Sequence, residues 1–421
     1  MRRLIVAIVL FVLVLPAPAV VADADKTYEK LDVFAQVLHY VQESYVENID
    51  SRRLLYSAIR GMLKTLDPHT VFMTPEEFKS MQEDTSGHFG GVGIELAVRD
   101  RQLVVVAPID DTPAARAGIM SGDLIVKIDG DSTKKMDVLE ASRRIKGVPG
   151  TKVVLTVDRA DFDKPKDFIL IRQRIRLNPI EKSMPIPGYG LLKIRAFTER
   201  TERFLMDGLK ELKSQSGGKL KGLVLDLRNN PGGLLDQSIR VADRFISDGV
   251  IVETRGRGNK VEKDFAHKRG TEPFYPMIVL INGGSASASE IVAGALQDHA
   301  RAVIMGTRSF GKGSVQTVVG LKDGSGLKLT IARYYTPKHR SIQERGIVPD
   351  VTVPARPPEL DTEIHITREK DLAGHLKKEK DALTPESLLE AIGDYQLRTA
   401  LYYLKVWEKF GRSRLSKKEA N

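Results

Sequence analysis

The strongest constraint on the fold lies in residues 189–355, where short apolar runs alternate with longer amphipathic stretches. We expect strands at 190–194, 222–227, 277–281 and 302–306, with helices at 199–214 and 235–247 between them. Such alternation predicts an α/β core. A chain of 421 residues exceeds what one hydrophobic core usually holds, so this core is expected to be one of two or three domains.

The residues before this core show two different periods. Residues 27–84 carry apolar side chains at helical spacing, as in Leu31, Phe34, Val37, Leu38, Val41 and Tyr45. Thr74 followed by proline and two glutamates marks a further helix start. Such a helical arm fits either an intramolecular prop or a dimer contact. From about residue 87 the period becomes two, which predicts a compact β-rich unit with strands at 92–98, 102–109, 124–130 and 152–159 and a helix near 136–146.

The remaining segments complete the predicted organisation. The stretch 173–188 holds Pro179, Pro185 and Pro187 and is interpreted as a linker. Residues 314–334 predict a hairpin around a glycine-rich turn, and residues 384–411 predict a helical tail.

The N-terminus has the pattern of an export signal. Met1-Arg2-Arg3 supplies positive charge, residues 4–15 are apolar, and small residues follow at 16–25. Cleavage after Ala19 or Ala22 would remove about the first 22 residues, and retention as an anchor is the alternative. The chain has no cysteine, which excludes disulfides, thiol chemistry and a lipidated cysteine.

Charge and composition narrow the partners. The net charge of +10 favours anionic surfaces, so peripheral membrane association is considered. One tryptophan and no interleaving of basic and aromatic residues argue against nucleic acid. No metal-ligand motif such as H-E-x-x-H is present, so neither a metal nor another cofactor is expected.

The turn after the predicted strand 277–281 contains the candidate nucleophile. Ser287 and Glu290 fit a capping box at the start of a helix. A serine at this place also lies beside free backbone N–H groups, which could stabilise an oxyanion. Capping and catalysis both remain open at this point. The G-x-S-x-G elbow is absent, which argues against an α/β-hydrolase triad.

A reactive serine also needs a general base that accepts its proton. His299 is the histidine nearest to Ser287 in the sequence, about three helical turns away. Lys312 lies between two glycines just before a predicted strand, and Gln316 follows four residues later. A lysine with a pKa near ~10.4 must lose its proton to act as a base, and burial can lower that pKa. Without burial, Lys312 would be an ordinary surface or anion-binding lysine.

A second glycine turn, residues 228–233, follows the strand 222–227, at the carboxyl end of a strand where open α/β sheets place ligands. The N–H groups of Gly232 or Gly233 could donate to an oxyanion, or the turn could simply connect a strand to a helix.

Together these segments resemble the carboxyl-terminal processing peptidases, tail-specific serine proteases with an embedded PDZ domain. The resemblance covers about residues 28–410 and is carried by the blocks 66–78, 225–233, 283–298, 309–316, 334–350 and 394–401. It implies a multi-domain α/β and α+β fold: a signal peptide at 1–22, a helical N-terminal region at 23–85, a PDZ domain at 86–172, a protease core at 173–360 and a helical C-terminal region at 361–421.

The resemblance also assigns roles. It implies Ser287 as nucleophile, Lys312 as general base and Gln316 as its orienting partner, with an oxyanion hole from Ala288 and one of Gly232 or Gly233. Asp298 matches a position sensitive in the family, although it could equally end the helix.

In the PDZ unit the resemblance implies a carboxylate-binding loop formed by Gly90, Gly91, Val92, Gly93 and Ile94. Consecutive N–H groups would bind a C-terminal carboxylate there while the substrate tail adds a strand to the sheet. The family couples this domain to the dyad through a basic residue, usually arginine. Here Lys146 stands at that position, and Arg143 or Arg144 could substitute for it.

The resulting expectation is an exported, periplasmic or otherwise extracytoplasmic, serine endopeptidase that recognises protein C-terminal tails and processes envelope proteins. An adaptor protein and a homo-oligomer are the further expected partners. The competing hypotheses are an inactive PDZ scaffold and a small-molecule esterase.

Overall fold

The structure is a computed structural model that describes residues 21–99, 101–109, 111–357 and 385–418. Contacts divide the chain into two units, residues 1–72 and 73–421, and each is considered by itself. The boundary lies inside the predicted helical region 23–85, so the third helix of that region belongs to the larger unit. Most of the predicted signal segment, residues 1–20, lies outside the described residues.

The first unit consists of the helices α1 (Val21–Ser44) and α2 (Ser51–Lys64), and the strand β1 (Val71–Met73) begins at its end. Asp50 caps α2, because its carboxylate accepts from the Arg52 N–H at 2.9 Å. The apolar face predicted on α1 is largely exposed, with Leu31 at 54% and Val37 at 56%. No helix among the described residues has the length and apolar character needed to cross a bilayer.

The larger unit opens with helix α3 (Pro75–Ser86). The predicted cap is confirmed: Thr74 N–H donates to Glu77 at 2.8 Å, and Glu77 N–H donates to the Thr74 hydroxyl at 3.3 Å. The helix ends at Gly87, whose φ of +68° favours glycine.

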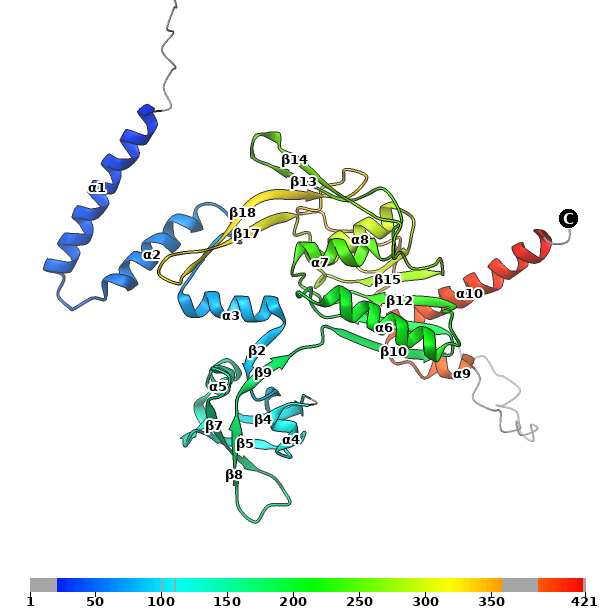
Figure 1. Cartoon of the computed structure of the whole chain (residues 1–421), viewed down its shortest axis with the longest axis horizontal. Coiled ribbons are helices and arrows are strands. Elements are labelled where there is room, and N and C mark those ends of the chain that lie inside the picture. Colours follow the sequence, from blue (N-terminus) through cyan, green and yellow to red (C-terminus); the bar gives the residue numbers. More distant parts are fainter. Residues whose placement is uncertain (1–20, 100, 110, 358–384, 419–421) are drawn as a thin grey trace, which may run out of the picture. The chain divides into compact units, whose positions relative to one another are not determined.

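The α/β core is a six-stranded sheet in the order β10-β11-β12-β15-β16-β19, with the last five strands parallel. These strands are β10 (Ile180–Ile186), β11 (Tyr189–Ile194), β12 (Gly222–Asp226), β15 (Met277–Ile281), β16 (Val303–Gly306) and β19 (Val351–Thr352). Helices α6 (Thr201–Gln215), α7 (Leu235–Asp243) and α8 (Ala288–Asp298) cover one face (Figure 1). All the predicted core strands and both predicted helices are confirmed.

The interpretation of 173–188 as a linker was wrong. Residues 173–176 form strand β9 and residues 180–186 form β10 at the edge of the core sheet. Pro185 is tolerated because it lies on an edge strand where the register with β11 shifts between Ser183 and Ile186.

A second, antiparallel sheet contains the predicted hairpin, β17 (Ser314–Gly320) and β18 (Gly326–Tyr335). Two strands that the sequence did not predict extend this sheet beside β18, in the order β18-β13-β14. They are β13 (Val250–Gly256) and β14 (Val261–Phe265), and a short 3-10 helix, η2 (Arg257–Asn259), joins them.

The predicted β-rich unit forms its own sheet around a separate core that includes Val105, Ile125 and Val153. Its strands run β3 (Ile94–Arg99), β4 (Gln102–Pro108), β5 (Leu124–Ile128), β7 (Lys152–Asp158) and β8 (Lys166–Ile171), with β6 (Asp131–Ser132) beside β5. The short helices are α4 (Pro113–Arg116), η1 (Thr133–Lys135) and α5 (Val138–Ile145). The chain enters through β2 (His88–Gly91) and leaves through β9 (Gln173–Arg176), which pair antiparallel.

The C-terminal helices α9 (Pro385–Glu390) and α10 (Tyr395–Lys418) cover the other face of the core sheet (Figure 1). Leu401 and Leu404 of α10 are buried against β12 and β15. Arg228, which follows β12, binds Asp226 and Asp394 at 2.7 Å each and thereby ties the tail to the core.

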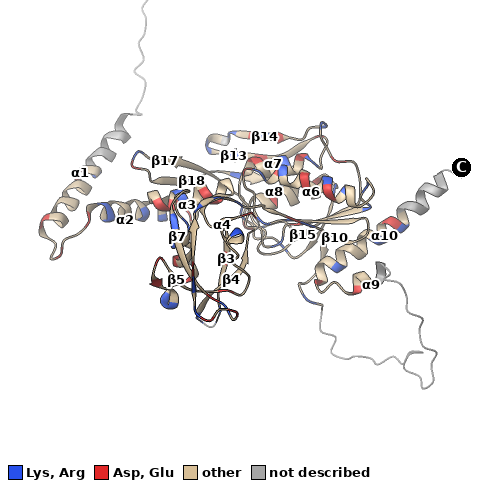
Figure 2. Ribbon diagram, turned by 60° about the horizontal axis from the view of Figure 1, so that its bottom comes forward, with Lys and Arg blue, Asp and Glu red and all other residues tan. Residues whose placement is uncertain are grey.

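Charge is distributed rather than gathered on these elements. Basic and acidic side chains are interspersed along α6 and α7, and the charged residues of α8 are the acidic Glu290 and Asp298 (Figure 2). The positive net charge therefore forms no single stripe on these three helices.

Candidate active site

The three serines of the predicted nucleophile turn and helix start are not equivalent. Ser285 is buried and donates to the Leu227 carbonyl at 2.8 Å, and Ser289 is buried and donates to the Asn230 carbonyl at 2.9 Å. Both hydroxyls therefore hold this turn against the turn that follows β12. Ser287 between them is half-buried and has φ +55° and ψ −112°, a strained conformation for a non-glycine residue. The strain singles out Ser287.

Ser287 is also the N-cap of α8, as predicted. Its N–H donates to the Glu290 carboxylate at 2.8 Å, and the Glu290 N–H donates to the Ser287 carbonyl at 2.9 Å. The two interpretations of this serine are thus compatible, since the residue starts the helix and faces a cleft.

Glu290 does more than complete the cap. Its carboxylate also accepts from the Ser309 hydroxyl at 2.5 Å, from Gly311 N–H at 2.7 Å and from Lys312 N–H at 2.9 Å. Burial raises the pKa of this carboxyl, while the four hydrogen bonds oppose the rise. One fully buried carboxylate therefore joins the segment that carries Ser287 to the segment that carries Lys312.

Lys312 and Gln316 form the contact that the sequence predicted. The Lys312 ammonium nitrogen Nζ donates to Gln316 Oε1 at 3.1 Å, and both side chains are half-buried. Lys312 precedes strand β17, whereas Gln316 lies within it, after a bulge. Between them, Gly313 packs closely on the backbone of Gln343, because a Cβ on Gly313 would lie 2.4 Å from the Gln343 nitrogen.

The second glycine turn packs directly against Ser287, the predicted nucleophile. A Cβ on Gly232 would lie 2.9 Å from the Ser287 Cβ and 3.0 Å from the Ala288 nitrogen. Only glycine allows so close an approach at a φ of +104°. The Gly232 N–H donates to Asn230 Oδ1 at 2.9 Å, so this amide is already engaged. Of the predicted oxyanion donors, the geometry favours Ala288 with Gly233, and their role stays a prediction.

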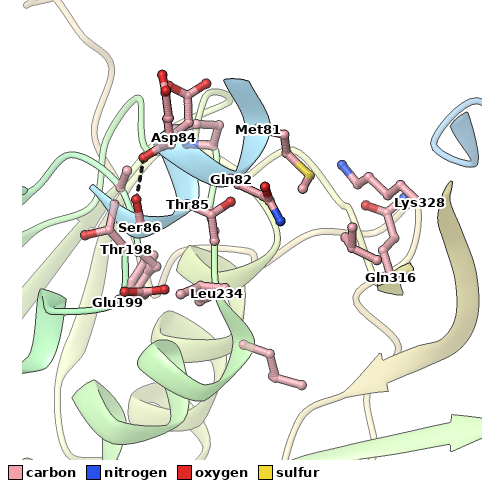
Figure 3. A pocket seen from close by; sticks show the side chains of 18 of the residues that line it. Met81, Gln82, Asp84, Thr85, Ser86, Thr198, Glu199, Leu234, Gln316 and Lys328 are labelled. Carbon is pink, nitrogen blue, oxygen red and sulfur yellow. Dashed lines mark hydrogen bonds between the residues drawn. The ribbon is translucent and has the colours of Figure 1, made fainter. Parts of the chain in front are cut away.

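These residues line one cleft of ≈ 1070 Å³, in which Ser287, Lys312 and Gln316 meet the glycine turn. Helix α3 contributes Met81, Gln82 and Asp84, and the loop before α6 contributes Thr198 and Glu199 (Figure 3). The hairpin contributes Lys328, which the sequence did not single out. The cleft is large enough for several residues of an extended peptide.

The other candidates lie elsewhere. His299 is at the far end of α8, where its Nε2 contacts the Val250 carbonyl at 2.7 Å. Asp298 closes the same helix, binds Arg340 and accepts from Lys338 N–H at 2.9 Å. No group of three or more metal-ligating side chains occurs in the part of the chain that the structure describes.

The predicted carboxylate-binding loop lies between β2 and β3. The carbonyls of Val92 and Gly93 accept from Ala114 and Ile109 N–H groups at 2.9 Å, within the domain. Ile94 begins β3, which is an edge strand of its sheet. A free edge beside this loop can accept an added strand.

Lys146 caps the C-terminus of α5, and its Nζ lies 4.9 Å from the centre of the Phe89 ring. Phe89 lines the cleft. Arg144 instead binds Asp131 and Glu140, at 2.6 Å and 3.2 Å. Of the basic residues considered, Lys146 is thus the one that contacts a side chain of the cleft.

Comparison with known proteins agrees with this geometry. Residues 188–353 match peptidase family S41, residues 104–159 match the PDZ domain, and residues 18–77 match the N-terminal domain of the activating protease CtpB. A carboxy-terminal-processing protease of Bartonella bacilliformis is 46% identical over 363 residues, which cover 86% of this chain and 83% of the relative. The chain belongs to the carboxyl-terminal processing proteases of peptidase family S41.

Two further relatives are less similar in sequence. A carboxyl-terminal-processing protease of Synechocystis is 38% identical over 321 residues, or 74% of each chain. The solved structure of a photosystem II D1 C-terminal processing protease is 32% identical, covers 78% of this chain and 88% of its own, and has a TM-score of 0.47. The S41 family membership makes this chain a serine peptidase with a PDZ domain.

Proposed function

We propose that this S41 peptidase is an endopeptidase in which Ser287 attacks the scissile carbonyl and Lys312 is the general base. The contact that carries the proposal is the 3.1 Å hydrogen bond from Lys312 Nζ to Gln316 Oε1, in the cleft that Ser287 also lines. A neutral amine can donate one N–H to Gln316 and still present its lone pair to a hydroxyl.

The reaction follows from these roles. Lys312 takes the Ser287 proton as Oγ bonds to the carbonyl carbon, and the carbonyl oxygen becomes an oxyanion beside Ala288 and Gly233. Collapse of this intermediate breaks the C–N bond, and the leaving amine takes the proton from Lys312. The neutral Lys312 then activates a water molecule, which hydrolyses the acyl ester and restores Ser287.

Substrate recognition is proposed to use the PDZ domain. A C-terminal tail would add a strand to the free edge of β3, with its carboxylate on the loop 90–94. The Lys146–Phe89 contact supports a link from this domain to the cleft. Envelope proteins as substrates and an adaptor partner remain part of the proposal.

Export to the periplasm or another extracytoplasmic space is proposed from the pattern of residues 1–22 alone. The exposed apolar side chains of α1 support a homo-oligomer, and the net charge of +10 supports peripheral contact with anionic membranes.

The test is cleavage of a flexible protein such as β-casein. Ser287→Ala should abolish cleavage with the fold unchanged by circular dichroism, and Ser183→Ala, at an exposed serine of β10, is the control. Lys312→Arg should be equally inactive, because arginine cannot lose its proton. Cleavage by Ser287→Ala would remove Ser287 from the mechanism, and cleavage by Lys312→Arg would remove Lys312 as base.

A further inference from the structure

The hairpin β17–β18 places a second lysine in the cleft. Lys328 of β18 pairs with Val318 of β17, and Thr330 pairs with Gln316. Residues two apart on a strand share a face, so Lys328 projects from the same face of the hairpin as Gln316. Figure 3 shows the Lys328 ammonium pointing into the cleft, toward Met81 of α3.

Lys328 lacks a counter-ion. It is half-buried, and within the described residues it makes no ion pair and no side-chain hydrogen bond. Lys213, a comparable half-buried lysine of the core, binds Glu272 at 2.9 Å and 3.1 Å. The acidic residues Glu83, Asp84 and Glu199 line the same cleft, but among the described residues none of them forms an ion pair with Lys328.

An ammonium in this position is costly for the free protein. Burial lowers the pKa of Lys328, and no neighbouring carboxylate offsets this effect. A carboxylate that entered the cleft would pair with Lys328, and this ion pair would offset the loss of hydration of the ammonium. Lys322, at the turn of the same hairpin, is exposed to solvent.

We propose that Lys328 is a specificity residue that binds a carboxylate of the peptide substrate in the cleft, beside the proposed Ser287–Lys312 dyad. The proposal rests on the proposed function and adds a preference for an acidic group near the scissile bond. That group is either an Asp or Glu side chain or the free terminal carboxylate, since both present the same charge and acceptors.

The experiment uses the full chain and pairs of fluorogenic peptides that differ only by Glu or Gln, at each position around the cleavage site. Each pair is made with a free and with an amidated C-terminus. The enzymes are the parent, Lys328→Met, Lys328→Glu and the control Lys322→Met. Met keeps the length and apolar stem of Lys328 without its charge.

The parent should cleave one acidic peptide with a kcat/KM about 10- to 100-fold above its neutral match, the range of a charge-assisted hydrogen bond. Lys328→Met should lose this preference through KM, with the neutral peptide within about twofold of the parent. Lys328→Glu should instead cleave the acidic peptide more slowly than its neutral match, because two carboxylates would then face each other. Lys322→Met should keep the parent's preference.

A preference that depends on Glu against Gln identifies a side chain, and one that depends on the free terminus identifies the terminal carboxylate; either result supports the proposal. Equal cleavage of all pairs by the parent would overturn it. A uniform loss of kcat in Lys328→Met for every peptide would also overturn it, because an effect on Lys312 acts on all substrates alike. Ser287→Ala, run on the neutral peptides, tests the dyad separately.

Discussion

Replacing Glu290 with glutamine should inactivate the protease by separating the two segments that carry Ser287 and Lys312, the proposed nucleophile and base. The carboxylate accepts from the N–H groups of Ser287 and Lys312 on one oxygen, and from Gly311 N–H and the Ser309 hydroxyl on the other. Glutamine has the same shape but presents an NH₂ group in place of one oxygen. If the NH₂ group replaces Oε2, it faces the N–H groups of Ser287 and Lys312. If it replaces Oε1, it faces the Gly311 N–H, while the Ser309 hydroxyl can rotate and accept from it.

The size of the effect follows from these bonds. Each buried donor left without a partner costs about 1–3 kcal/mol, so the variant loses at least about 1–3 kcal/mol, in the less costly orientation, from the conformation that the parent adopts. A shift of the Ser287 segment or of the Lys312 segment away from residue 290 would relieve this cost. A displacement of about 1 Å between reacting groups costs on the order of 100-fold in rate. We therefore expect kcat to fall at least 100-fold, with a smaller change in KM.

The assay is peptide hydrolysis, together with urea unfolding of the same samples. Glu272→Gln is the matched control, because Glu272 is also buried and bonded, to Lys213 and Tyr275, but lies outside the cleft. It should lose stability and keep its kcat. A kcat for Glu290→Gln within threefold of the parent would refute the idea that this carboxylate sets the spacing of the two segments.

Three further predictions concern the glycine turn and the tail. Gly232→Ala should lower kcat/KM more than about 100-fold, because its Cβ would lie 2.9 Å from the nucleophile's Cβ; Gly218→Ala, with a similar φ of +97° but open space around it, should keep full activity. Arg228→Met should lower the free energy of unfolding in urea by about 3–5 kcal/mol, because it leaves the buried Asp226 unpaired; a loss under 1 kcal/mol would contradict this. Burial pushes the pKa of Asp394 up, but hydrogen bonds from Arg228 and backbone N–H groups outweigh it and lower the pKa below 3.8. The folded state then binds fewer protons than the unfolded state, so this stabilisation is present above pH 3.8 and is lost as pH falls through the lowered pKa. Asp394→Asn should flatten that loss in acid titrations of stability, and an unchanged slope would argue against it.

Local patterns were enough to predict most of the fold. Core strands such as 277–281 are short apolar runs that end in glycine turns, and this combination fits few structures other than a buried strand. Strand β14, Val261–Phe265, was missed because it is an exposed edge strand whose sequence, VEKDF, is mostly charged. The prolines of 173–188 suggested a linker because sequence alone does not show which strand lies at a sheet edge.

Family motifs were enough to predict that Ser287, Lys312 and Gln316 lie in one cleft, and their catalytic roles stay a prediction. The rest depends on contacts between distant segments. Glu290 was predicted only as a capping residue, because its bonds to residues 309–312 arise when two turns meet in the fold. Lys328 has no local signal, since a lysine on a hairpin strand is usually solvated, and its place in the cleft follows from strand register.

The anchoring of α10 bears on the resistance of this protease to autolysis. A protease that processes the C-terminal parts of proteins also has such a part in its own chain. Here Asp394 is clamped by Arg228, and Gln396 donates to the Val353 carbonyl at 2.7 Å. The buried leucines that follow hold the next turns against the sheet. Autolysis of this region would require α10 to detach from the core sheet, so we expect cleavage to stop before it reaches the anchored part of α10.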